Sequence, residues 1–335
     1  MSAAEYKAAF LDAVLGLLWR QWSGLGVAAQ VPAADDARVL DPEALLIASS
    51  VFCRYDQRLF DLAASWLVKY GLLVNPTRLK ALVRKMHWGD GASLAYLAAL
   101  RAQSGDKRWQ RPAEQEASGA TGLRPMFLHA GGESPVYCRQ RDELAARYGL
   151  LRTPFEYRDK LSRALPDSAA TLLLRMRGMY GVSARADVIM HLLHAPATIQ
   201  QLSDLSGFAR SSVKEVLQEL EAGNAVYAVE RSRRNTAYAL AHGAALRGLF
   251  GCESSRLVPW GEVFACLGRL WDLISNPLME RVSADTFRGE LRLVFQEHVQ
   301  PCFLTCGIRL LQHLTADTLH LLPAAIRELG LVIKE

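Results

Sequence analysis

The stretch from about Arg185 to Ala241 constrains the fold more than any other, because its hydrophobic spacing predicts three short helices in succession. Each helix has apolar residues three or four positions apart, and these are Val188, Ile189, Leu192 and Leu193, then Ile199, Leu202 and Leu205, then Val213, Val216, Leu217 and Leu220. Pro196 ends the first helix, and Thr198 is a favourable N-cap for the second. Gly207 can adopt a positive φ without strain, so it predicts a tight turn before the third helix.

The third helix has a polar side that would face away from the first two. This side carries Ser211, Ser212, Lys214, Glu215 and Gln218, with Arg210 at its start. Small hydroxyl residues and a lysine near a helix N-terminus allow close approach to phosphates and to the edges of bases. The polar side therefore predicts a helix that enters the major groove of DNA.

The residues after the third helix predict a β-hairpin with a basic tip. Residues 226–230 alternate in character as a strand does, and residues 236–240 supply a second strand. Between them, residues 231–235 include three arginines. A flexible cationic tip of this kind suits contact with the DNA backbone or entry into the minor groove.

This order of helix, helix, turn, helix and basic hairpin resembles the winged helix-turn-helix domain of bacterial MarR- and ArsR-type transcriptional regulators. The resemblance is limited to about residues 185–241, and the rest of the chain matches neither family. It implies that the third helix reads the major groove, that the hairpin contacts the flanking backbone, and that homodimers bind palindromic double-stranded DNA. By position it implies DNA-binding roles for Arg210, Ser211, Ser212, Lys214, Gln218, Arg231, Arg233, Arg234 and Asn235.

The chain has 335 residues, which is more than one hydrophobic core usually accommodates. Its sequence divides into a helical N-terminal domain (1–101), a polar linker or mobile loop (102–122), a mixed, basic connecting segment (123–180), the winged-helix domain (181–245) and a helical C-terminal domain for dimerisation or sensing (246–335). Strand patterns are scarce outside the motif. The predicted fold class is therefore mainly α, with one small β-hairpin.

Charge alone leaves the partner open, since a net charge of +5 permits nucleic-acid binding without requiring it. Between Arg185 and Ala241 the acidic and basic residues balance, and the bases gather at the start of the third helix and in the hairpin tip. The alternative function is a winged helix that docks a protein, as an antitoxin-like or complex-assembly subunit, without specific DNA binding.

The cellular setting is predicted from what the sequence lacks. No apolar run approaches the roughly 20 residues of a membrane span, and no basic leader precedes an apolar core. Six cysteines without framework spacing indicate reduced thiols, so we expect a cytoplasmic protein. Nucleotide-binding, zinc-protease and serine-hydrolase motifs are absent from the sequence, so no enzymatic activity or cofactor is predicted. A small-molecule effector remains open.

Three weaker patterns have two interpretations each. His298, Cys302 and Cys306 would share one helix face if the helix continues through Pro301, which suggests a thiophilic metal, but no fourth ligand is evident and buried free cysteines are common. A second helix-turn-helix can be drawn over residues 61–85, with an exposed face of Thr77, Arg78, Lys80, Arg84 and Lys85. The stretch containing Trp260 and Trp271 suits either helix packing or a dimer interface.

Overall fold

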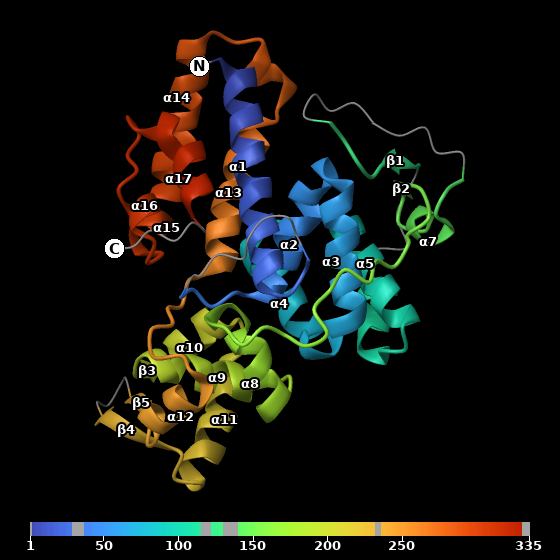
Figure 1. Ribbon diagram of the computed structural model, residues 1–335. Coiled ribbons are helices and arrows are strands. Elements are labelled where there is room, and N and C mark those ends of the chain that lie inside the picture. Colours follow the sequence, from blue (N-terminus) through green and yellow to red (C-terminus); the bar gives the residue numbers. More distant parts are fainter. Residues whose placement is uncertain (1, 29–36, 115–121, 130–139, 232–235, 330–335) are drawn as a thin grey trace.

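The computed structural model of the chain describes residues 2–28, 37–114, 122–129, 140–231 and 236–329 (Figure 1). The described residues are mainly helical with a small antiparallel sheet, as predicted. They pack around two hydrophobic cores, a larger one and a smaller one. None of the described helices is long and apolar enough to cross a membrane.

The larger core joins helices from both ends of the chain, and we call this part the helical body. Its helices are α1 (Ala3–Gly24), α2 (Pro42–Phe52), α3 (Gln57–Tyr70), α4 (Pro76–Met86), α5 (Gly91–Gln103), α6 (Gln110–Glu114), α7 (Glu143–Ala146), α13 (Trp260–Ile274), α14 (Ala284–Val294), α15 (Gln300–Thr305), α16 (Arg309–Gln312) and α17 (Leu322–Glu328). Short turns connect them: η1 (Cys53–Tyr55), η2 (Gly71–Leu73), η3 (Lys107–Trp109), η5 (Pro277–Glu280), η6 (Phe295–Val299) and η7 (Leu319–Leu321).

Contacts between α1 and the C-terminal helices hold the two ends of the chain together. Phe10 of α1 stacks on Trp271 of α13 with ring centroids 6.1 Å apart. The hydroxyl of Tyr6 donates a hydrogen bond to the carbonyl of Leu319 at 2.9 Å. Helix α1 also lies beside α17 (Figure 1). The terminal regions 1–101 and 246–335 therefore contribute to one buried cluster.

Helix starts in the body follow capping signals that the sequence displays. The Asp41 carboxylate accepts a hydrogen bond from the Ala44 amide at 3.0 Å, and Pro42 occupies the first turn of α2. Asn75 and Pro76 begin α4 in the same way. A side-chain acceptor at the N-cap satisfies an amide that the helix leaves open, and proline fixes the φ angle of the first turn.

The segment 102–122, predicted as a linker or mobile loop, is helical in its first part. Helix α5 continues to Gln103, and η3 and α6 follow it. Trp109 is completely buried in the larger core. A polar composition thus does not prevent one large apolar side chain from anchoring the segment. A parallel pair of two-residue strands, β1 (Arg124–Pro125) and β2 (Leu150–Leu151), follows.

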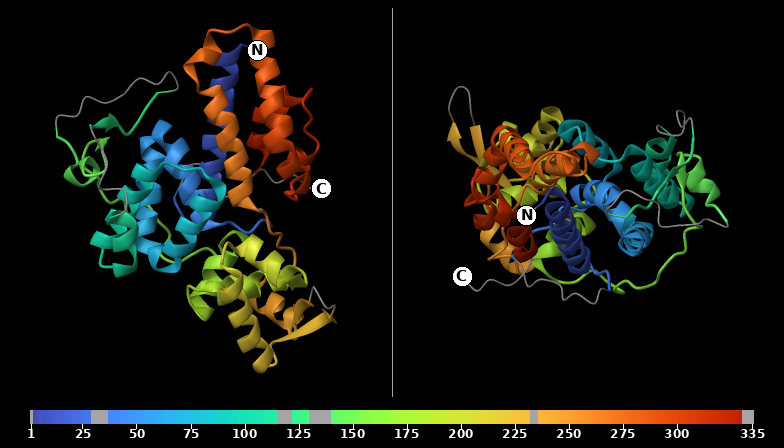
Figure 2. Two further views of the ribbon diagram at one scale, coloured as in Figure 1. Left: turned by 180° about the vertical axis from the view of Figure 1, so that it is seen from behind. Right: turned by 90° about the horizontal axis from the view of Figure 1, so that it is seen from above.

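The smaller core belongs to a middle domain, which we define as α8 to α12. It consists of α8 (Leu172–Tyr180), α9 (Ala184–His194), β3 (Ala197–Thr198), α10 (Ile199–Ser206), α11 (Arg210–Ala222), β4 (Val226–Arg231), β5 (Thr236–Leu240) and α12 (Gly243–Phe250), preceded by η4 (Ala169–Thr171). The domain projects from one end of the helical body, as two further views show (Figure 2).

The three helices and two strands predicted between residues 185 and 241 are confirmed as α9, α10, α11, β4 and β5. The antiparallel sheet has the order β3-β5-β4, so it gains a third strand. Strand β3 has only two residues, too few to display an alternating pattern.

Trp260 and Trp271 lie inside the helical body. The indole nitrogen of Trp260 donates to the carbonyl of Val39 at 2.9 Å, and Trp271 packs edge-on against Tyr55. Both side chains are buried within the chain. Helix packing is confirmed for this stretch, and the alternative of a dimer interface is wrong for these two side chains.

Candidate nucleic-acid interface

Helices α10 and α11 are joined by a turn that local sequence explains. The Thr198 hydroxyl accepts a hydrogen bond from the Gln201 amide, and the Gln201 side chain accepts one from the Thr198 amide, which completes a capping box. Gly207 ends α10 with a φ of 77°, a left-handed conformation that favours glycine. Phe208 then packs against the smaller core.

Helix α11 has a buried side and a polar side. Val213, Val216 and Leu217 are buried against α9 and α10. On the polar side Arg210, Ser211, Lys214 and Gln218 are exposed, and Ser212 is half-buried. The predicted candidates on this helix therefore share one accessible side.

At the start of α11, neither the first-turn amides nor the cations are paired with a side chain of the described residues. Its N-cap is Ala209, which has no side chain able to accept hydrogen bonds from the first-turn amides. Arg210 and Lys214 form no ion pair within the described residues. Open amides and two free cations at a helix N-terminus favour an anion.

The second half of α11 has the opposite charge. It carries Glu219 and Glu221, and Glu219 forms an exposed ion pair with Arg185 at the start of α9. Both positive charges of α11 thus lie in its first two turns, together with Glu215.

The hairpin of β4 and β5 extends beside α11. Val226 lies opposite Leu240 and Tyr227 opposite Ala239, and the register shifts between Ala228 and Glu230. Arg231 is the last residue of β4. The side chain of Arg231 and the predicted tip residues Arg233, Arg234 and Asn235 lie outside the described residues.

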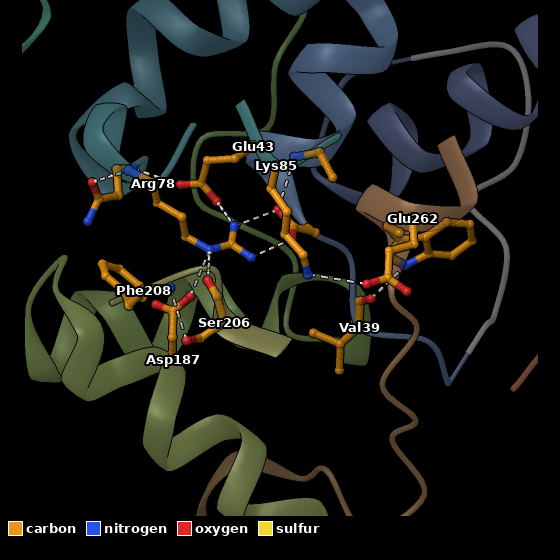
Figure 3. Close-up of polar contacts among 12 residues, drawn as sticks. Val39, Glu43, Arg78, Lys85, Asp187, Ser206, Phe208 and Glu262 are labelled. Carbon is orange, nitrogen blue, oxygen red and sulfur yellow. Dashed lines mark hydrogen bonds and ion pairs between the residues drawn. The ribbon is translucent and has the colours of Figure 1, made fainter. Parts of the chain in front are cut away.

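A buried ionic network joins the middle domain to the helical body (Figure 3). Arg78 of α4, predicted to be exposed, is only 3% exposed. Its guanidinium donates to Asp41 at 2.6 Å, to Glu43 at 2.5 Å and to the carbonyl of Ser206 in α10 at 2.6 Å. The prediction of an exposed helix-turn-helix face at this position is therefore wrong, because three acceptors draw the arginine into the junction.

A second arginine, Arg177 of α8, completes the network. It donates to Glu43 at 2.6 Å and forms a bidentate pair with Asp187 of α9, both bonds being 3.1 Å. Glu43 is fully buried and bridges both arginines. Burial by itself would raise the pKa of Asp41, but the charge of Arg78 and its hydrogen bonds lower that pKa to about 2. The same carboxylates raise the pKa of Arg78. Asp41 and Arg78 are therefore both ionised at neutral pH.

Close packing accompanies the network. A Cβ atom on Gly207 would lie 3.1 Å from a methyl carbon of Leu82, so α4 contacts the turn before α11 directly. Lys85 of α4 donates to the carbonyl of Asp204 at 3.0 Å and pairs with Glu262 of α13 at 3.3 Å. The orientation of α10 and α11 relative to the body is thus fixed by both charge and shape.

A cavity of about 250 Å³ lies at the same junction. Apolar side chains from both parts line it, among them Leu82, Met86 and Trp260 of the body and Leu173 and Met190 of the middle domain. A molecule in this cavity would contact both parts at once.

His191 of α9 also lines the cavity. Burial lowers the pKa of its imidazole to about 4, so the ring is neutral at physiological pH. Its Nδ1 atom is buried and has no hydrogen-bond partner in the described part of the chain. The second histidine of this helix, His194, bonds instead to the carbonyl of Met190 and to Ser255.

The weak metal candidates are not brought together. The helix does continue through Pro301, but a π-helical turn at Phe295–Val299 changes the register. As a result His298 is exposed, whereas Cys306 is buried. A hydrogen bond with Cys266 raises the pKa of Cys302, and burial raises that of Cys306, so both thiols favour the protonated form over the thiolate that binds metals. Among the described residues no group of three or more His, Cys, Asp or Glu could hold a metal ion.

Comparisons of this chain with known proteins identify no relative. No family model matches the chain, and no curated protein or solved structure matches it significantly.

Proposed function

We propose that this chain is a sequence-specific DNA-binding transcriptional regulator and that residues 184–240 act as a winged helix-turn-helix. The order α9, β3, α10, α11, β4, β5 supports this proposal, as does the sheet order β3-β5-β4 beside the three helices. In such an arrangement α11 is the recognition helix and the β4–β5 hairpin is the wing.

The outer side of the first half of α11 is the observation that carries the proposal. Lys214 and Gln218 are exposed one turn apart, and Arg210 and Ser211 precede them at an uncapped helix start. Lysine and glutamine side chains hydrogen-bond to guanine and adenine edges in the major groove. The hydroxyl groups and open amides suit the flanking phosphates.

The wing supplies the backbone contacts in this proposal. Arg231, Arg233, Arg234 and Asn235 would meet the phosphates beside the groove that α11 occupies, which gives affinity without sequence preference. The protein would act in the cytoplasm as a homodimer on a palindromic site. The helical body would dimerise or sense a signal, and the junction cavity is where an effector would contact both parts.

Two kinds of variant test these roles by fluorescence-anisotropy titration with DNA duplexes. Arg233→Ala combined with Arg234→Ala weakens binding to every duplex, because it removes backbone contacts. Lys214→Ala and Gln218→Ala instead change which base pairs are preferred, because these side chains read base edges. Arg288→Ala, an exposed change on α14, is the control and leaves both properties unchanged.

The proposal fails if the Lys214 and Gln218 variants keep both the affinity and the base preference of the unchanged protein. Unchanged affinity of the double arginine variant would remove the wing from the interface.

A protein-docking role is the second candidate, and edge strand β4 favours it. Tyr227 and Val229 on this strand are each 52% exposed, an unusual exposure for large apolar side chains in a sheet. In that role the middle domain pairs with a partner protein. Co-purification of a stoichiometric protein, together with absent or salt-insensitive DNA binding, would favour this candidate over DNA recognition.

A further inference from the structure

The described surface of the helical body has a second cationic site, on the exposed side of α4. An open depression of about 310 Å³ is lined by Lys80 and Arg84 of α4, Arg108 of η3 and Arg111 of α6, together with Thr77. No carboxylate lines it. Three of the four cations, Lys80, Arg84 and Arg111, form no ion pair within the described part of the chain.

These cations repel one another as long as no anion lies between them. Lys80 and Arg84 are four residues apart on one helix, where like charges repel each other. Arg111 adds a third positive charge from a different element. The fourth, Arg108, is fixed by Asp106 at 2.6 Å and by the carbonyl of Leu72 at 3.1 Å, so one wall of the depression is rigid. A hydroxyl, an ammonium and guanidinium groups around one hollow are the donors that phosphate oxygens accept from.

The depression lies on α4, the helix that contacts the turn before α11. Arg78 and Leu82, on the neighbouring side of α4, contact Ser206 and Gly207 directly. Arg210 follows Gly207 by three positions, so the Cα atoms of Arg84 and Arg210 are within roughly 30 Å of each other. One turn of B-DNA is longer, at about 34 Å. A duplex read by α11 is therefore long enough to extend as far as α4.

We propose that this depression binds the phosphodiester backbone of the same DNA duplex that α11 reads, and so extends the DNA interface onto the helical body. The inference rests on the proposed DNA-binding function. It assigns the body a direct part in binding, beside dimerisation or sensing. Because the buried Arg78 network fixes α4 against α10, the two contact regions keep one spacing and bind as a unit.

The test is a triple variant, Lys80→Ala, Arg84→Ala and Arg111→Ala, in the full chain. All three side chains are exposed, so the fold is expected to persist, and circular dichroism with thermal unfolding checks it. The matched control removes three exposed arginines of α14 and α17, Arg288→Ala, Arg292→Ala and Arg327→Ala, with the same change in net charge. Anisotropy titrations use the upstream promoter duplex and a scrambled duplex at several salt concentrations.

The expected result is weaker binding to both duplexes, with the preference for the promoter unchanged. The slope of log affinity against log salt becomes shallower by about 0.9 for each phosphate that the variant no longer neutralises, hence by roughly 2 to 3. The control keeps the slope of the unchanged protein.

Two results would overturn the inference alone. In the first, the unchanged protein binds DNA and the triple variant retains its affinity and salt slope. In the second, inorganic phosphate stabilises the unchanged protein but not the triple variant, while DNA binding is the same for both, which assigns the depression to a free anion. If the unchanged protein binds neither duplex, the proposed function and this inference fail together.

Discussion

Arg78 and Lys80 are two positions apart on α4, yet their charges have opposite surroundings. Arg78 is buried among carboxylates and a backbone carbonyl, whereas Lys80 is exposed and has no ionic partner in the described residues. The junction between the middle domain and the helical body likewise has buried, paired cations, whereas the outer side of α11 has exposed ones that pair with no described residue. A buried, fully paired charge fixes structure, and an exposed, unpaired cluster is available to an anion. The position of a cation on α4, more than its residue type, therefore decides whether it fixes the structure or can bind an anion.

The largest expected effect comes from breaking the junction. Arg177→Met leaves Glu43 and Asp187 buried with fewer partners, so the free energy of unfolding falls by about 3–5 kcal/mol. Urea unfolding followed by circular dichroism measures it. A decrease of less than about 1 kcal/mol in the free energy of unfolding would contradict this expectation, because exposed ion pairs already contribute that much.

Burial of His191 at the junction also makes stability depend on pH. The pKa of His191 is lowered to about 4 by burial, from an ordinary value near 6.5. Between these values the unfolded chain binds a proton that the folded chain does not, so stability decreases as pH falls from 6.5 to 4. The loss is roughly 3 kcal/mol.

His191→Leu removes this dependence between pH 6.5 and 4, and urea unfolding at four or five pH values detects the change. The Asp41 carboxyl acts in a lower window. Its pKa is lowered from 3.8 to about 2, so its contribution is lost as pH falls through that range. A pH profile identical in the variant and the unchanged protein would contradict the assignment to His191.

Changes on the outer side of α11 are expected to affect DNA binding and leave stability almost unaltered. Lys214→Ala costs about 1–3 kcal/mol of binding free energy on the preferred site, the usual value for one base contact. Its unfolding midpoint stays close to that of the unchanged protein, because the side chain is exposed and unpaired. Parallel anisotropy and urea titrations separate the two effects. A large loss of stability with unchanged DNA affinity would instead assign Lys214 a structural role.

The smallest effect is expected at an exposed ion pair within the middle domain. Arg185 and Glu219 are paired but about half exposed, so Arg185→Ala changes the free energy of unfolding by about 0–1 kcal/mol. Arg177→Met measured under the same conditions is the direct comparison, since each variant removes one arginine from its carboxylate partners.

The local elements of the middle domain could be predicted from sequence because their signals are local. Apolar spacing located α9 to α11, and Thr198 and Gly207 marked where α10 begins and ends. Burial of charge could not be predicted in the same way. Arg78 was expected on an exposed face, but its partner Glu43 is 35 positions away, and Glu43 is 134 positions from Arg177.

One long-range feature, the burial of Arg177, does have a signal in the sequence. Arg177 follows the apolar run 172–174 within one short helix, and a charge on a buried helix requires a buried partner. The joint core of α1 and α17 left none, because an apolar helix face shows that it is covered without showing by which helix.

The most direct test of DNA recognition is a fluorescence-anisotropy titration of the unchanged protein with its own upstream promoter duplex and a scrambled duplex, at low and near-physiological salt. If the unpaired cations of α11 and the wing contact DNA, binding to the promoter is tighter, survives physiological salt, and weakens steeply as salt rises. Absence of binding to both duplexes at low salt would contradict the account.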